Sequence, residues 1–198
     1  MMIDPDAGEA LAQADDDLRP NLAVLVGGAV TIGVISALSL PWTAAIASTV
    51  LGTLMVAGAE VDARTFLLPD PITWGAVVCG IVAAPLLDAE ASWITAGEAM
   101  ARAGCVAIIL ALFRGGYAWI RRSEGLGLGD VKLAAAIGAW LPVEAIPLCF
   151  GLATSAALLM VMFAHLKGRP VTRTTRIPFG TFLCPALWIV FYVDHVTR

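Results

Sequence analysis

Three alternating glycines precede a lone aspartate in the stretch "EGLGLGDVKL", residues 124–133. Glycines cost backbone entropy on folding, and they are useful where the backbone adopts positive φ or where another segment approaches closely. Asp130 follows them and opens a hydrophobic segment. An N-cap role for Asp130 is one interpretation, but a cap does not require Gly125, Gly127 and Gly129. We therefore predict a polar, water-accessible notch with Asp130 at its rim.

A second group of charged residues lies in "AGAEVDARTFLLPDPITW", residues 57–74. Glu60 and Arg64 are four residues apart with the acid first, which favours a helical ion pair. Asp70 directly precedes a proline, the arrangement expected of an N-cap with proline at the first helical position. Asp62 has neither explanation, because it lies about 200° around the helix from Glu60. A structural ion pair with Arg64 is the alternative for Asp62.

Asp62 and Asp130 are therefore the candidates for chemistry. A charged side chain at membrane depth costs about 2.5–3.5 kcal/mol on insertion scales, so each needs a reason to be there. If their helices are neighbours, two facing carboxylates cannot easily both ionise, and one keeps a proton near neutral pH. The ionised group can take a proton from water while the protonated group polarises a carbonyl, as in aspartic peptide-bond hydrolysis. Lys132 either extends to the membrane interface or tunes the field at Asp130.

The elements that must position these residues are membrane helices. The chain has 198 residues, of which 59% are hydrophobic and 14% charged, and its mean hydropathy is +0.85. A soluble domain is less apolar and carries more charge, so we predict an all-α, polytopic transmembrane helix bundle of six to seven spans in a lipid bilayer. The fifth candidate is short and is expected to tilt or to enter only partway. The candidate spans are 21–40, 42–60, 71–88, 97–119, 130–142, 144–166 and 178–194.

Residues 1–20 are expected to be a mobile acidic cytoplasmic tail, and 21–198 a single transmembrane domain. The first residues lack the basic start of a signal peptide, so the first span is expected to remain. The basic residues form no patch interleaved with aromatic residues, which argues against a nucleic-acid partner. The four cysteines form no C-x-x-C pair and are expected to be small core residues. We expect neither a metal nor a cofactor, and the sequence does not predict the oligomeric state.

Sidedness follows from the basic residues. If the loop at 61–70 is cytoplasmic, alternation places ten basic residues on that side and two on the other. The ten are Arg19, Arg64, Arg114, Arg121, Arg122, Lys132, Lys167, Arg169, Arg173 and Arg176, and the two are Arg102 and Arg198. Both candidate aspartates then face the cytoplasm.

Three stretches together resemble a known family. "GLGLGDVKLAAAIGAW" resembles the GxGD signature and following helix of the type IV prepilin peptidases, which are integral-membrane aspartic proteases. "DARTFLLPDPIT" looks like their other active-site stretch. "RIPFGTFL", residues 176–183, is similar to a third, with Thr181 where proline is common. The likeness covers roughly residues 50–185.

The resemblance implies that Asp62 and Asp130 are catalytic and that Gly127, Gly129 and Lys132 belong to the active-site loop. It also implies cleavage of the short basic leader of a prepilin or pseudopilin, at the cytoplasmic face of the bacterial inner membrane. Many family members carry an N-terminal domain with paired Cys-x-x-Cys motifs and also methylate the new pilin terminus. This sequence shows no such motif, so a short, peptidase-only form is expected.

Two hypotheses from other classes stay open on the residues alone. A proton-coupled transporter would use Asp62 and Asp130 as carriers, because intramembrane acids often serve that way. However, the middle of the bundle offers no relay of ionisable residues. An inactive structural partner of a secretion apparatus would need no chemistry, but it leaves both aspartates and the glycines without a role.

Overall fold

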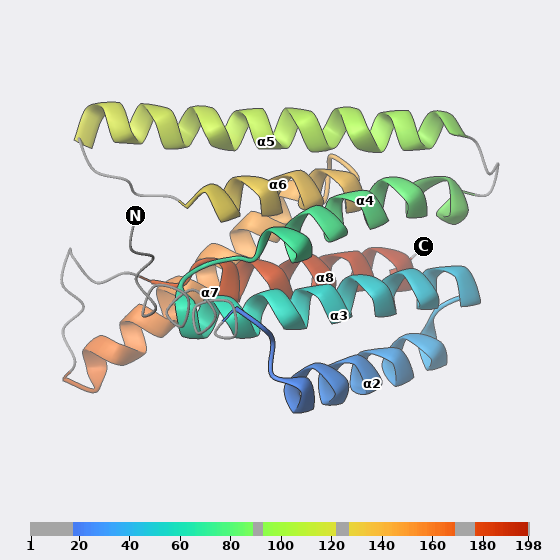
Figure 1. Ribbon diagram of the computed structural model, residues 1–198, viewed down its shortest axis with the longest axis horizontal. Helices are drawn as coiled ribbons and strands as arrows, with labels where there is room; N and C mark the ends of the chain where they lie inside the picture. The colour runs from blue at the N-terminus through green and yellow to red at the C-terminus, as the bar shows by residue number, and fades with distance from the viewer. Residues whose placement is uncertain (1–17, 89–92, 122–126, 169–176, 198) are drawn as a thin grey trace, which may run out of the picture.

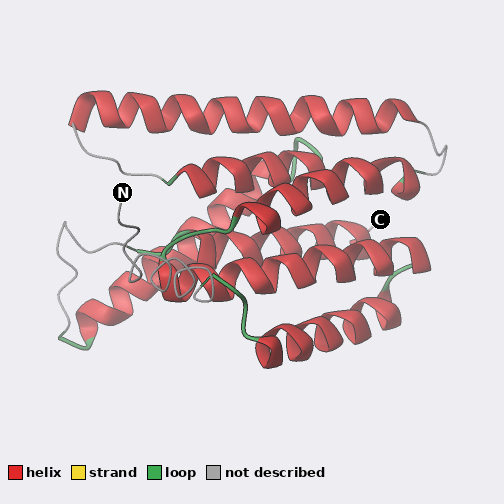
Figure 2. Ribbon diagram, in the orientation of Figure 1, coloured by secondary structure: helices red, strands yellow, loops and turns green. Residues whose placement is uncertain are grey.

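The computed structural model describes residues 18–88, 93–121, 127–168 and 177–197, and these residues form helices and no strand (Figures 1 and 2). The predicted acidic tail therefore lies almost wholly outside the described residues, as do Gly125 and the basic residues of 169–176. The helices are α2 (Leu22–Ser39), α3 (Trp42–Thr65), α4 (Asp70–Leu87), α5 (Trp93–Arg121), α6 (Leu128–Trp140), α7 (Ile146–Leu166) and α8 (Gly180–Thr197).

Length and hydropathy confirm the all-α, polytopic bundle. Six of the described helices are long and apolar enough to cross a membrane, and α6 is the exception. At 13 residues, α6 extends about 20 Å, less than the roughly 30 Å of a hydrocarbon core. The fifth predicted span is therefore a helix that does not reach across by itself.

Two helix ends differ from the prediction in ways that matter for the site. The span predicted for 42–60 continues to Thr65, so Asp62 is part of the last turn of α3. The span predicted for 97–119 is the 29-residue helix α5, which begins at Trp93 and ends at Arg121. Hydropathy underestimates the lengths of both helices, because their ends carry polar residues although the helical backbone hydrogen bonds continue.

The core of the bundle lies between α3, α4, α6 and α8, which pack against one another with α5 and α7 outside. Its largest fully buried side chains include Leu51, Met55, Ile137, Leu187 and Phe191. The outer helices expose long apolar side chains along their length, as expected where lipid replaces water.

The prediction that all four cysteines are small core residues is confirmed only in part. Cys149 and Cys184 are buried and Cys79 is half-buried, but Cys105 is exposed. Cys105 lies on α5, whose outer face is apolar rather than polar, so a small sulfur-bearing side chain is compatible with that surface without being part of the core.

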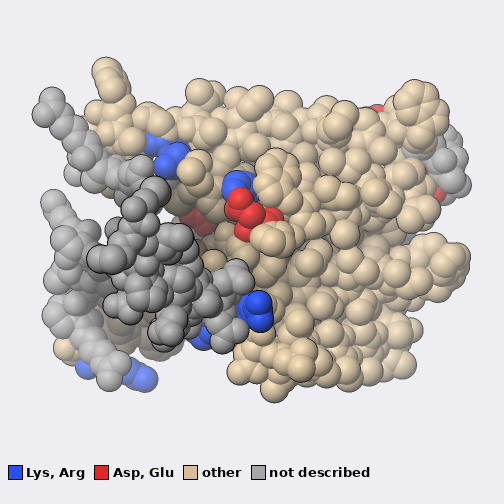
Figure 3. Space-filling model, viewed as in Figure 1, with Lys and Arg blue, Asp and Glu red and all other residues tan. Residues whose placement is uncertain are grey.

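Charge is distributed unevenly along the bundle. In Figure 3, the Lys and Arg atoms on the visible face gather toward the end where α3 finishes and α6 begins, whereas the few charged atoms visible at the opposite end belong to Asp or Glu. At the opposite end of α5, Arg102 lies 3.9 Å from Glu98 and also donates to the carbonyl of Gly138. The pattern fits the predicted sidedness.

A chain of buried hydroxyl and indole groups joins α2, α3 and α8. The hydroxyls of Ser36 and Ser48 lie 2.8 Å apart, and Trp188 donates its indole N–H to Ser48 Oγ at 3.0 Å. Both serines are fully buried. Hydrogen bonds between membrane helices contribute about 0.6 kcal/mol on average and up to about 2 kcal/mol.

We expect Ser48→Ala to lower the unfolding free energy in detergent by about 1 kcal/mol, because it removes the shared partner of Ser36 and Trp188. The measurement is thermal or denaturant unfolding of the purified protein. Thr53→Val is the matched control on the same helix, because the Thr53 hydroxyl bonds only to the Thr49 carbonyl one turn below. Equal losses in the two variants would contradict a role for Ser48 between helices.

Candidate active site

The two candidate aspartates lie at the same end of the bundle, at the left in Figure 1. Asp62 is in the last turn of α3 and is 4% exposed, whereas Asp130 is in the first turn of α6 and is 8% exposed. Helices α4 and α8 pack against both α3 and α6, so the aspartate-bearing helices share neighbours. Leu68 lies against Gly129, which precedes Asp130, and against Gly180, where an added Cβ would lie 2.9 Å from Asp62 Oδ2. The structure therefore brings together two buried acids from distant parts of the chain.

Asp62 is held by the first turn of α8. The backbone N–H of Thr181 donates to Asp62 Oδ2 at 2.7 Å, and the Thr181 hydroxyl donates to the same oxygen at 3.0 Å. The N-terminus of a helix favours a carboxylate because its N–H groups are unpaired and its dipole is positive there. The alternative pairing of Asp62 with Arg64 is wrong, since Arg64 bonds to Glu60 and to the Arg19 carbonyl.

Thr181 is the functional contact that sequence reasoning missed. It drew attention only as a departure from the proline common in the resembling family, and no local pattern links it to Asp62, 119 residues away. The available signal was that a threonine adds two donors, an N–H and a hydroxyl, where a proline has none.

Asp130 is not the N-cap of α6. The helix begins at Leu128 with Gly127 as its N-cap, and Asp130 is the third helical residue. From there its Oδ2 accepts a hydrogen bond from the Gly127 N–H at 3.2 Å, which is half of a capping box. The carboxylate thus satisfies one helix-end donor.

Asp70 is likewise not the predicted N-cap. Pro69 occupies the cap position with φ −62°, and Asp70 is the first residue of α4. Its carboxylate instead accepts a hydrogen bond from Lys132 Nζ of α6. Lys132 therefore has as its partner an acid 62 positions earlier in the chain, a contact that neither of its two predicted interpretations included.

The ion pair predicted between Glu60 and Arg64 is confirmed. Arg64 Nε lies 2.7 Å from Glu60 Oε1, and Arg64 Nη2 donates to Glu60 Oε2 at 2.9 Å. Glu60 also accepts from the backbone N–H of Asn21. The pair ties the segment before α2 to the outer face of α3, away from Asp62.

Close backbone approach explains the glycine next to Asp130. A Cβ on Gly129 would lie 3.0 Å from Leu68 Cβ, so the turn between α3 and α4 comes almost into contact with the α6 backbone. Gly180 is similar, because a Cβ there would lie 2.9 Å from Asp62 Oδ2 and nearer still to Leu68 Cδ1. Gly127 has φ −71°, so positive φ does not account for it. Leu68 thus lies between the glycines that flank the two aspartates.

The turn that carries Leu68 is tight. Phe66 ends α3 in the left-handed region with φ 57°, and its N–H donates to the Asp62 carbonyl. A non-glycine residue costs roughly 1–2 kcal/mol there. This conformation lets the chain reverse within four residues and begin α4 beside the end of α3.

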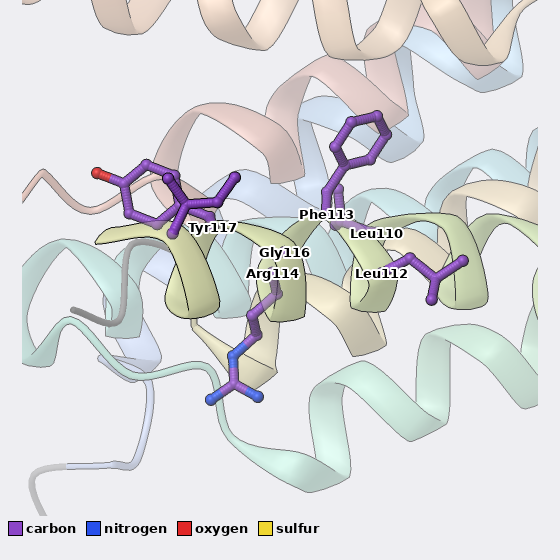
Figure 4. A pocket seen from close by; sticks show the side chains of 7 residues that line it. Leu110, Leu112, Phe113, Arg114, Gly116 and Tyr117 are labelled. Atoms are coloured by element: carbon purple, nitrogen blue, oxygen red, sulfur yellow. The ribbon is translucent and has the colours of Figure 1, made fainter. Parts of the chain in front are cut away.

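A hollow elsewhere on the surface does not involve the aspartates. It is lined by residues of α5 alone, and Figure 4 shows the labelled side chains of Phe113, Arg114 and Tyr117 pointing in different directions from one helix. Such an arrangement has no convergent polar groups, which a binding site needs. Within the described part of the chain, no group of three or more His, Cys, Asp or Glu side chains could hold a metal ion.

Comparison with known proteins links this arrangement to one family. A family model described as "Type IV leader peptidase family" matches residues 49–162, which include both aspartates. The "Leader peptidase HopD" of Escherichia coli is 35% identical over 133 residues, covering 65% of this chain and 81% of that protein. The protein of the same name from Salmonella typhimurium is 36% identical over 141 residues and is covered over 86% of its length.

A longer relative is also similar. The "Prepilin leader peptidase/N-methyltransferase" of Aeromonas hydrophila is 28% identical over 196 residues, which is 94% of this chain. This chain spans 62% of that relative's length, about three fifths. No solved structure matches the chain.

We expect Asp62→Asn and Asp130→Asn each to raise the unfolding free energy by about 1 kcal/mol, as often occurs when a functional group is removed. The amide keeps an acceptor for Thr181 or Gly127 but carries no charge, which lowers the cost of burial and the repulsion between the acids. Unfolding in detergent at neutral pH measures the effect. Glu144→Gln, at an exposed position, should leave stability unchanged. A loss of stability in both aspartate variants would mean that the carboxylates serve the fold.

Proposed function

Because this chain belongs to the type IV leader peptidase family, we propose that it is a membrane-embedded aspartic endopeptidase with Asp62 and Asp130 as its catalytic pair. Its substrates are prepilins or pseudopilins, from which it removes a short basic leader. The observation that carries the proposal is that two buried carboxylates, from α3 and α6, lie beside Gly180 and Gly129, which both approach Leu68.

Hydrolysis by such a pair needs one ionised and one protonated carboxylate. The ionised group removes a proton from water, the water oxygen bonds to the carbonyl carbon, and the protonated group gives its proton to the carbonyl oxygen. The C–N bond of the resulting gem-diol then breaks as its nitrogen takes the proton that the first carboxylate received. One hydroxyl of the diol returns a proton to the second carboxylate, which restores both groups.

The surroundings of the two acids suit this reaction. Oδ2 of Asp62 already accepts two hydrogen bonds, so Oδ1 is the oxygen left for a water or a proton. Gly127 presents no side chain beside Asp130 Oδ2, which suits an extended substrate backbone. Hydrogen-bonded positioning of both carboxylates before the substrate arrives lowers the entropy cost of reaction.

The cytoplasmic membrane of a bacterium is the proposed location, with the aspartates at the cytoplasmic end. The support is the gathering of Lys and Arg residues at that end of the bundle. In membrane proteins the loops that are rich in Lys and Arg normally stay on the cytoplasmic side. A leader that carries basic residues remains on that side for the same reason. The substrate would therefore present its cleavage site at the end where Asp62 and Asp130 lie.

No observation favours the proton-coupled transporter. Both carboxylates lie at one end, and the ion pair of Glu98 with Arg102 lies at the other end, on α5. Among the described residues between these ends, the buried polar side chains are hydroxyls. Hydroxyls bound to one another hold helices together but do not carry a charge across the bundle.

We expect Asp62→Asn and Asp130→Asn each to reduce cleavage on the order of 10³-fold or more, because each removes a proton-transfer group. The measurement is the size of a candidate prepilin from the same genome, co-expressed with wild type or variant and followed on a gel. Glu144→Gln is the control carboxylate. Membrane levels of all variants should be equal, and full cleavage by either aspartate variant would remove that residue from the catalytic pair.

A further inference from the structure

The ion pair between Asp70 and Lys132 links the two segments that carry the aspartates. Asp70 opens α4 directly after the turn that follows Asp62, and Lys132 lies two residues beyond Asp130 on α6. The Asp70 side chain is 64% exposed and that of Lys132 28%. An ion pair this exposed contributes little to stability, so stability alone does not account for it.

The pair lies directly beside the turn at 66–69. Phe66 and Leu67 in this turn are exposed, at 47% and 60%, so their own packing restrains it weakly. Leu68 is the residue that reaches inward, where it lies against Gly129 on one side and Gly180 on the other. The Asp70–Lys132 pair fixes the turn to α6 just beyond Leu68.

Leu68 in turn lies against a neighbour of each proposed catalytic group. Gly129 precedes Asp130 directly, and Gly180 precedes Thr181, which holds Asp62. The neighbouring cation, Arg64, is engaged with Glu60 and with the Arg19 carbonyl on the other face of α3. Among the described residues, the Asp70–Lys132 pair is therefore the contact between a charged side chain of this turn region and α6.

We propose that Asp70 and Lys132 are positioning residues: their ion pair holds Leu68 across the start of α6 and so sets the separation between Asp62 and Asp130. This inference rests on the proposed peptidase function. Misplacing a catalytic group by about 1 Å costs on the order of a hundredfold in rate. A weak surface contact can therefore matter for catalysis even where it contributes little to stability.

The test is a double-mutant cycle on cleavage by the full-length protein in reconstituted membranes, with kcat and KM measured separately. Asp70→Asn and Lys132→Met should each lower kcat roughly tenfold to a hundredfold with little change in KM, because positioning rather than substrate binding is lost. The double variant should be no worse than either single variant, since the two residues act as a unit. Asp70→Glu and Lys132→Arg keep the pair and should keep most of the activity.

A matched control lies on α3. Glu60→Gln and Arg64→Met break an ion pair at the same end of the bundle that does not contact α6, and both should leave kcat unchanged. Melting temperatures of all variants show whether activity is lost without unfolding. Because Asp70 is exposed, we expect Asp70→Asn to fold normally. This variant therefore decides the test even where a Lys132 variant does not accumulate in the membrane.

Two results would overturn the inference. Opposite effects of Asp70→Asn and Lys132→Met that cancel in the double variant would show that Lys132 acts through its field on Asp130. Unchanged kcat in Asp70→Asn would show that the pair positions nothing. Asp62→Asn and Asp130→Asn are run alongside: if either still cleaves, the proposed function fails; if both are inactive while Asp70→Asn is normal, only the positioning role fails.

Discussion

Two carboxylates removed from water at one end of an apolar bundle are the constraint on which the site depends. An unpaired buried charge is costly, so each acid needs hydrogen-bond donors that do not neutralise it. The bundle supplies them from helix N-termini: α8 begins where Asp62 lies, and Asp130 accepts the N–H of Gly127, the N-cap of its own helix α6. The end of α3, the start of α8 and the turn at 66–69 must therefore meet at one place.

Much of the architecture was predictable because the signals are local. Apolar runs about 20 residues long predicted the helices. The shortness of α6 was visible in the sequence as well. Asp62 and Asp130 stood out because each lacked a sufficient explanation within its own helix, and the helical pair of Glu60 with Arg64 was recognisable from spacing alone.

The rest could not be predicted because it depends on contacts between helices. Thr181 meets Asp62, and Asp70 meets Lys132, only after α8 and α6 have packed beside α3 and α4. Such contacts also decide what the acids at a helix start do. The carboxylate of Asp70 pairs with Lys132 and does not cap α4. Asp130 accepts the N–H of the N-cap Gly127 from within the first turn of α6. Spacing identifies which residues need partners, but packing decides which partners they find.

The lengths of α5 and α6 have a consequence for lipid. At 29 residues α5 extends about 44 Å, more than twice the length of its neighbour α6. Eight of the 13 residues of α6 are buried, against α4, α5, α7 and α8. Bilayer thickness is therefore expected to change the tilt of the outer helices. The helix that carries Asp130 is surrounded mainly by other helices rather than by lipid. A change in membrane composition would therefore move the outer helices more than it moves Asp62 and Asp130.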